Sequence, residues 1–296
     1  MTLQNKRTVI IANCFHVFRH FDKAILKILI YLIFTETFLT GSVANANGIS
    51  LGTYFLVYTS NELAIAAIDS LVTKITPATG AISYSTTCKI SILDDHAFFF
   101  SEGVLGIVSA NNEDDSYVSK IAKIEYNRRS NPVQKIKLPV DFGRIADDWS
   151  KTIIQWLQAH YASMKQQIND RPEGRITVGY FVGEDSLGNI ATIEAKIIKE
   201  QAMTIPIFDA KISLLPPHTF KVIGHTDIFN GFANAFQADH SPQNRPNILA
   251  AKIKMAVEAV RDKGNDPYVG GDIATVILER GHKWRWFHRP DFCPEN

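Results

Sequence analysis

Thr53 directly follows Gly52. A threonine that becomes the first residue of a chain can act as a nucleophile. A threonine hydroxyl is a weak nucleophile near neutral pH, so a base must take its proton. Cutting the chain between Gly52 and Thr53 would free the α-amine of Thr53, and a free α-amine titrates at about 8. That amine can act as the base within the same residue. Thr53 is therefore a candidate nucleophile if the chain is cut at this bond; the alternative is an ordinary strand threonine.

Three residues that could assist such a threonine follow in order: Asp69, Lys89 and Gly103. An ammonium group near a hydroxyl and an amine favours their deprotonated forms. A carboxylate can hold that ammonium through a charge-assisted hydrogen bond, and a glycine N–H can face a developing oxyanion. Thr53 and Asp69 are 16 positions apart, and Lys89 and Gly103 are 14 apart.

These segments, in this order and spacing, resemble proteasome β subunits and their bacterial relatives, which are N-terminal-nucleophile hydrolases. The resemblance extends from Gly52 to about Phe287. It rests on Gly52-Thr53, Ala67-Ile68-Asp69-Ser70, Lys89 opening a strand, Gly103 ending the next strand, and Asp266-Pro267-Tyr268-Val269-Gly270-Gly271.

The resemblance implies a catalytic set of Thr53, Asp69, Lys89, Gly103 and Asp266, with Gly52 as the propeptide junction. Thr53 would form an acyl-enzyme with a peptide or small amide substrate, without a cofactor or metal ion. Val269 and His225 stand where the family has supporting serines. The alternative is therefore a non-catalytic protein of the same fold with an assembly or binding role. With either function the chain could form a homo-oligomer.

Hydrophobic patterns predict the strands and helices that would position these residues. Alternating or continuous apolar runs predict strands, and apolar residues at helical spacing predict helices. The order of strands, helices, strands, helix and strands favours an α+β fold, and the resemblance implies a four-layer αββα sandwich. The predicted strands are 54–58, 63–68, 89–93, 97–100, 175–182, 189–198, 272–278 and 283–287, and the predicted helices are 142–168 and 246–261.

The first 46 residues are typical of an export leader. Basic residues precede an apolar run over 28–34, and Ala44-x-Ala46 fits a signal-peptidase site. We therefore expect a signal peptide or membrane leader over 1–46, a short propeptide over 47–52 and a hydrolase-like domain over 53–296. The protein would be exported, or membrane-anchored if the leader stays uncleaved.

Net charge, cysteines, histidines and the C-terminal aromatic residues limit the kinds of protein and of binding site that this chain can be expected to have. The net charge of +1 argues against a nucleic-acid binder that relies on bulk charge. Without the leader, Cys88 and Cys293 remain; they could pair after export or stay as two buried thiols. His225, Asp227 and His240 lack the spacing of a metal site. The basic and aromatic residues of 283–289 are more typical of an amphipathic strand than of an anion-binding surface.

Overall fold

The computed structural model describes residues 46–51, 54–75, 82–109, 112–113, 117–130, 141–169, 174–200, 207–223, 245–263 and 270–295. They belong to one unit that begins at Ala46. Of the predicted leader, only its last residue is described. None of the described helices is long and apolar enough to cross a membrane.

Five antiparallel strands form one sheet, here called sheet B, in the order β12-β2-β3-β13-β14. The predicted hairpin at its centre is present: Phe55 pairs with Ile68, and the Ser60 N–H donates to the Leu63 carbonyl to close the turn. The strands are β2 (Phe55–Thr59), β3 (Leu63–Asp69), β12 (Thr219–Ile223), β13 (Ile273–Glu279) and β14 (Arg285–His288).

The other nine strands form a continuous antiparallel network in the order β11-β10-β9-β7-β1-β4-β5, with β6 and β8 also paired to β7. β7 is its longest strand. The members are β1 (Ala46–Leu51), β4 (Leu71–Ile75), β5 (Ile82–Thr86), β6 (Ile90–Asp94), β7 (Ala97–Ser109), β8 (Asn112–Glu113), β9 (Arg175–Glu184), β10 (Ile190–Glu200) and β11 (Ile207–Leu214).

β7 divides this network into two sheets at Gly103. Up to Gly103, β7 pairs with β6 on one side and with β9 on the other. β9 pairs in turn with β10, and β10 pairs with β11; we call this part sheet C. From Val104 onward it pairs with β1 and β8, which together with β4 and β5 form sheet A. Gly103 has φ +88°, a conformation that side chains other than glycine rarely adopt. The predicted end of the strand at Gly103 is therefore wrong, because the glycine redirects β7 instead of ending it.

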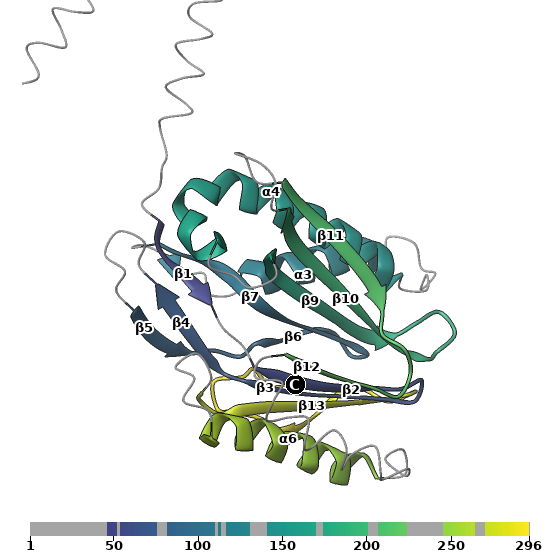
Figure 1. Cartoon of the computed structure of the whole chain (residues 1–296). Coiled ribbons are helices and arrows are strands. Elements are labelled where there is room, and N and C mark those ends of the chain that lie inside the picture. The colour runs from purple at the N-terminus through teal and green to yellow at the C-terminus, as the bar shows by residue number, and fades with distance from the viewer. Residues whose placement is uncertain are drawn as a thin grey trace, which may run out of the picture. The chain divides into compact units, whose positions relative to one another are not determined.

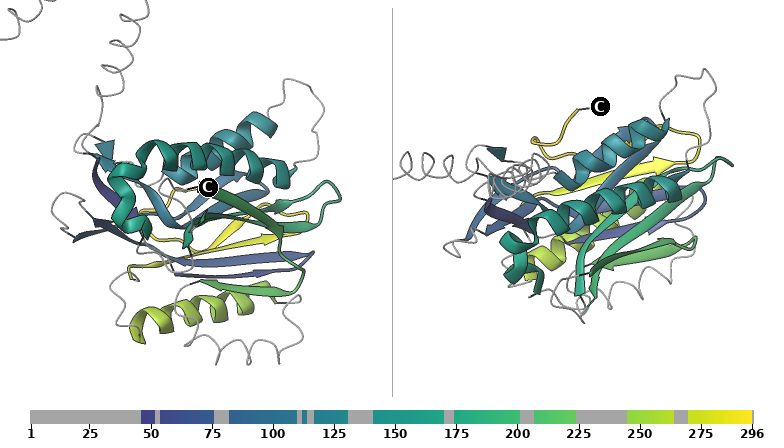
Figure 2. Two further views of the ribbon diagram at one scale, coloured as in Figure 1. Left: turned by 45° about the horizontal axis from the view of Figure 1, so that its top comes forward. Right: turned by 90° about the horizontal axis from the view of Figure 1, so that it is seen from above.

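Three helices cover the outer faces of sheets B and C: α3 (Tyr117–Ser130), α4 (Phe142–Asn169) and α6 (Pro246–Lys263). α3 and α4 lie side by side along β7, β9, β10 and β11, and α6 lies against sheet B (Figures 1 and 2). Trp149 of α4 packs against Phe99 and Phe181 and donates its indole N–H to the Val118 carbonyl of α3 at 3.0 Å. This single side chain joins both helices to sheet C.

The apolar run 97–100 is continuous because both faces of β7 are covered. Phe99 faces the helices, whereas Phe98 and Phe100 face sheet B. Phe100 stacks on Tyr180, and both rings contact Phe55 of β2 at centroid distances of 4.9 Å. Since successive side chains of a strand alternate between faces, a buried strand needs apolar residues at every position.

The predicted four-layer αββα sandwich is wrong. The described residues are dominated by antiparallel strands in three sheets, with only three helices. A two-sheet sandwich has no place for sheet A, which branches from β7 through β1, β4 and β5 (Figure 1). The physical reason is the turn in the backbone at Gly103, which gives one strand two sets of partners.

Most predicted elements match observed ones within two residues, but several strands were missed. No strand was predicted for β1, β4, β5, β8, β11 or β12. The segment from Val104 onward contains the second half of β7, then β8 and α3, and no element was predicted there.

Candidate active site

Asp69, the last residue of β3, is the centre of the candidate site. Its side chain is fully buried and accepts three hydrogen bonds. Oδ1 accepts from Lys89 Nζ and from the backbone N–H of Tyr54, both at 2.8 Å. Oδ2 accepts from the backbone N–H of Gly270 at 3.2 Å. One carboxylate thus ties together three segments that are distant in the sequence.

Lys89 comes from the opposite side of the sheet interface. It directly precedes β6 of sheet C, and only 2% of its side chain is exposed. The neighbouring backbone is held to the β3–β4 link, because the Thr87 N–H donates to the Ser70 carbonyl at 3.0 Å. The structure therefore brings together Asp69 and Lys89, two of the predicted site residues.

Burial and ion pairing shift the pKa values of Asp69 and Lys89 in opposite directions. Burial raises the pKa of the Asp69 carboxyl, while Lys89 and the two backbone N–H donors counteract the rise. Burial likewise lowers the pKa of the Lys89 amine, and the Asp69 carboxylate opposes that shift. A lysine with a lowered pKa gives up a proton more readily than one in water, which suits a site for proton transfer.

Gly270 and Gly271 close the site from the start of the β13 segment. The Gly270 carbonyl accepts from the Leu71 N–H at 3.1 Å, so this segment binds on both sides of Ser70. Gly271 has φ +72°, and a Cβ there would overlap the Ser70 hydroxyl oxygen. The two glycines that end the Asp266–Gly271 motif therefore contact the Asp69-Ser70 segment.

Gly103 is packed too closely for any side chain. A Cβ at this position would overlap the Ile176 carbonyl oxygen and lie 2.9 Å from the Thr177 Cα. Gly103 pairs with Thr177, while Val104, the next residue, pairs with Leu51 of β1. The last described residue before the Gly52–Thr53 junction thus lies beside the strand of Gly103.

Four of the predicted positions lie outside the described residues: Gly52, Thr53, Val269 and Asp266. The three residues whose spacing does not fit a metal site, His225, Asp227 and His240, also lie outside the described residues. Among the residues that are described, no group of His, Cys, Asp or Glu side chains could hold a metal ion. Thr53 is nevertheless bracketed by described neighbours, because Leu51 pairs within sheet A and Tyr54 N–H binds Asp69.

Sequence reasoning left one structural feature open and missed another. Cys88 and Cys293 form a disulfide beside Lys89, a pairing that was left open. A second ion cluster also joins sheets C and B: buried Glu194 accepts from Tyr180 at 2.6 Å and pairs with Lys196 and Lys221. Glu194 alternates with apolar residues in β10, but nothing in that pattern identifies its partner on β12.

No protein-family model matches this chain, and no curated protein matches it either.

Proposed function

We propose that this chain is a self-processing threonine hydrolase that cleaves amide or peptide bonds. Thr53, freed by cleavage of the Gly52–Thr53 bond, is its nucleophile. The observation that carries the proposal is the bonding of Asp69, which holds both Lys89 Nζ and the N–H of the residue following Thr53. A single oxygen atom, Oδ1, accepts both hydrogen bonds, so it fixes the cation and the start of β2 next to each other.

In the proposed reaction, the Thr53 hydroxyl attacks the carbonyl carbon of the substrate amide, and its proton passes to the α-amine of Thr53. The Lys89 ammonium favours the deprotonated forms of both groups. The Gly103 N–H is assigned to the oxyanion, and such a donor typically contributes ~10²–10³ in rate. The C–N bond then breaks, the departing amine takes the proton, and water hydrolyses the ester left on Thr53. Asp266 is proposed to support the N-terminal segment.

The placement of β1 supports a substrate bound in an extended conformation. β1 lies between β4 and β7, with Leu51 paired to Thr73 on one side and Val104 on the other. It therefore presents the residues before the junction as a strand held by main-chain hydrogen bonds on both sides. After cleavage, a peptide could pair with the same two strands, which is a common mode of peptide recognition.

The disulfide supports the proposed export of the protein. Disulfides persist in oxidising compartments outside the cytosol, and Cys88–Cys293 is such a cross-link. It agrees with the basic, then apolar, then small-residue pattern of the first 46 residues.

The test is the intact mass and N-terminal sequence of purified wild type, Thr53→Ser and Thr53→Val. Valine matches the shape of threonine but lacks the hydroxyl, whereas serine keeps the hydroxyl. Wild type and Thr53→Ser should begin at residue 53, while Thr53→Val should retain Gly52. A β-lactone probe, which acylates nucleophilic hydroxyls, should then add to the processed wild type on the Thr53 peptide.

Two outcomes would refute the proposal: a folded wild type that retains Gly52, or a Thr53→Val chain cut at the same bond. The first would leave Thr53 without a free amine and would favour the non-catalytic alternative. The second would assign the cut to another protease.

A further inference from the structure

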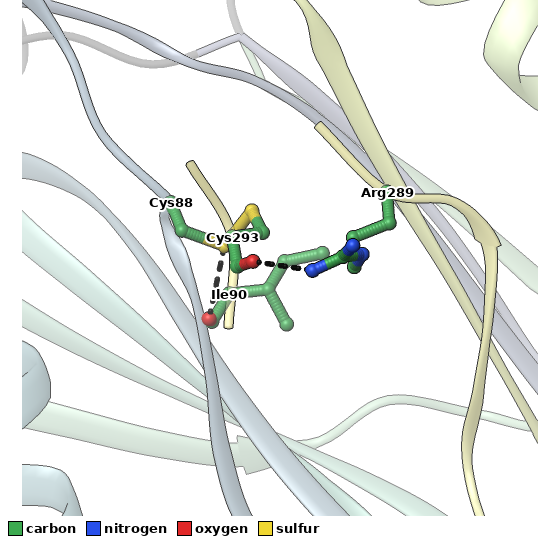
Figure 3. Close-up of a disulfide and its surroundings, with 4 residues drawn as sticks. All are labelled: Cys88, Ile90, Arg289 and Cys293. Carbon is green, nitrogen blue, oxygen red and sulfur yellow. Dashed lines mark hydrogen bonds between the residues drawn. A yellow bond between two sulfur atoms is a disulfide. The ribbon is translucent and has the colours of Figure 1, made fainter. Parts of the chain in front are cut away.

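The Cys88–Cys293 disulfide is joined directly to the candidate site, because Cys88 is the residue before Lys89. It connects two positions that are 205 residues apart in the chain. Figure 3 shows the cross-link between the strand that continues through Ile90 and the C-terminal segment that carries Arg289.

The C-terminal end of the cross-link is a fixed point. Cys293 is 2% exposed and packs among the apolar side chains between sheets B and C. Its N–H donates to the Pro290 carbonyl at 2.9 Å, and its carbonyl accepts from Arg289 Nη1 at 3.0 Å (Figure 3). These contacts hold Cys293 to the segment that follows β14.

The Lys89 end is less constrained by the sheets themselves. Residues 87–89 lie between β5 and β6 and belong to neither strand. On one side Thr87 bonds the Ser70 carbonyl, and on the other Ile90 pairs with Phe100. Between these two points, Cys88 is the residue covalently fixed to another part of the fold, and it lies next to the lysine that must reach Asp69.

We propose that the Cys88–Cys293 disulfide positions Lys89, so that the Asp69–Lys89 ion pair is complete only in the oxidised chain. The consequence rests on the proposed function: the hydrolase would stay inactive in a reducing compartment and assemble its site after export. Formation of the bond removes two electrons and two protons from the thiols. Glutathione disulfide can accept them and is reduced to two glutathione thiols.

The experiment measures acetylation of individual lysines by acetic anhydride, followed by peptide mass spectrometry. It uses the full-length Thr53→Ala chain, with and without Cys88→Ala and Cys293→Ala. In the oxidised chain Lys89 is buried against Asp69 and should react slowly. In the double cysteine variant its acetylation should rise about tenfold, as expected for a segment that opens locally. Lys196 and Lys221, paired with Glu194 on other strands, should be unchanged.

The pH dependence of acetylation distinguishes a disulfide that positions Lys89 from one whose loss only loosens the fold as a whole. Because burial lowers the pKa of Lys89, its labelling should begin at lower pH in the oxidised chain than in the variant. Equal Lys89 labelling and an equal pH profile in both folded chains would overturn the proposal. A parallel rise at Lys221 would also overturn it, since loss of the cross-link would then expose both lysines alike and would have no particular effect on Lys89.

If the double variant does not fold, the folded parent chain is reduced with dithiothreitol, its thiols are blocked with iodoacetamide, and the same lysines are compared. An unblocked portion is reoxidised with glutathione disulfide, which should restore the protection of Lys89; continued labelling would contradict the proposal. Thr53→Ala cannot process itself through this residue. The result therefore stands apart from the test of Thr53, and either proposal can fail alone.

Discussion

Lys89 Nζ lies 2.8 Å from Asp69 Oδ1, and this contact joins sheet C to sheet B at the end of β3. Neither side chain has appreciable contact with solvent. A buried charge that loses its partner cannot be compensated by water, so the pair is the most sensitive point of the site.

Asp69→Asn should destabilise the protein strongly. The change keeps the shape of the side chain but leaves the Lys89 ammonium buried beside a neutral amide. Breaking a buried pair in this way typically costs about 3–5 kcal/mol in the free energy of unfolding. Chemical denaturation measures it, with Asp95→Asn as the matched control, because Asp95 pairs with Lys283 on the exposed surface. The control should differ from wild type by less than about 0.5 kcal/mol. Equal losses in both variants would contradict the assigned role of the buried pair.

Gly103→Ala should be far more damaging than Gly188→Ala. Both glycines have positive φ, +88° and +74°, so alanine carries a similar backbone penalty of about 1–2 kcal/mol at each. A Cβ at Gly188 meets nothing within 4 Å, whereas a Cβ at Gly103 overlaps the Ile176 carbonyl. We expect Gly103→Ala to cost at least about 4 kcal/mol, as exceptional single substitutions do. Thermal unfolding of the two variants checks this, and similar melting temperatures would show that β7 can shift away from β9.

Glu194 should make the stability of the protein depend on pH in the acid range. Burial alone would raise the pKa of Glu194, but hydrogen bonds from Tyr180 and Lys196 and the charge of Lys221 lower it overall. A carboxyl with a lowered pKa contributes stability above the pKa of the unfolded chain. That stability is lost as pH falls through the folded-state pKa. Glu194→Gln should cost about 2 kcal/mol at pH 7 and progressively less below pH ~4.5.

Urea denaturation of wild type and Glu194→Gln across this pH range gives the comparison. Glu200→Gln, near the end of the same strand, serves as the control because residue 200 is exposed. A difference between wild type and Glu194→Gln that stays constant with pH would refute the link to ionisation.

Reduction of the disulfide should lower the stability of the whole protein as well as affect Lys89. A cross-link over 205 residues restricts the unfolded chain strongly, and loss of a native disulfide typically costs about 2–5 kcal/mol. Denaturation with and without a reductant measures the loss. The reductant should have no effect on Cys88→Ala/Cys293→Ala, and an effect there would mean that it acts elsewhere in the molecule.

Hydrophobic periodicity was sufficient to predict the elements that bury one complete face. α4 and α6 carry apolar residues at helical spacing, and β2, β3 and β9 are buried along their length. β5 and β11 were missed because they are edge strands with mostly exposed side chains, so no apolar alternation identifies them. The division of β7 into two sheets was also missed, because a glycine with positive φ inside a strand has no distinctive pattern around it.

The candidate site was predicted in part. The resemblance led to the correct expectation that the Asp69 and Lys89 side chains meet. The choice between a Cys88–Cys293 disulfide and two free thiols stayed open, because two cysteines 205 residues apart give no information about their distance in space. The contact between Gly271 and Ser70 depends on the path of the chain between α6 and β13, which residue types do not specify.

The insertion of β1 between β4 and β7 has a consequence for the timing of maturation. Cutting the bond before Thr53 would not by itself empty the strand position beside Gly103, because the paired residues Ile49, Ser50 and Leu51 would still be held by both neighbours. The cut product would be a complex of two fragments in which β1 still fills the strand position between β4 and β7. Native mass spectrometry would record it as one species and denaturing mass spectrometry as two. Under the proposed function, the rate at which this strand dissociates, and not the rate of the cut, would then determine when a substrate can first pair with β4 and β7.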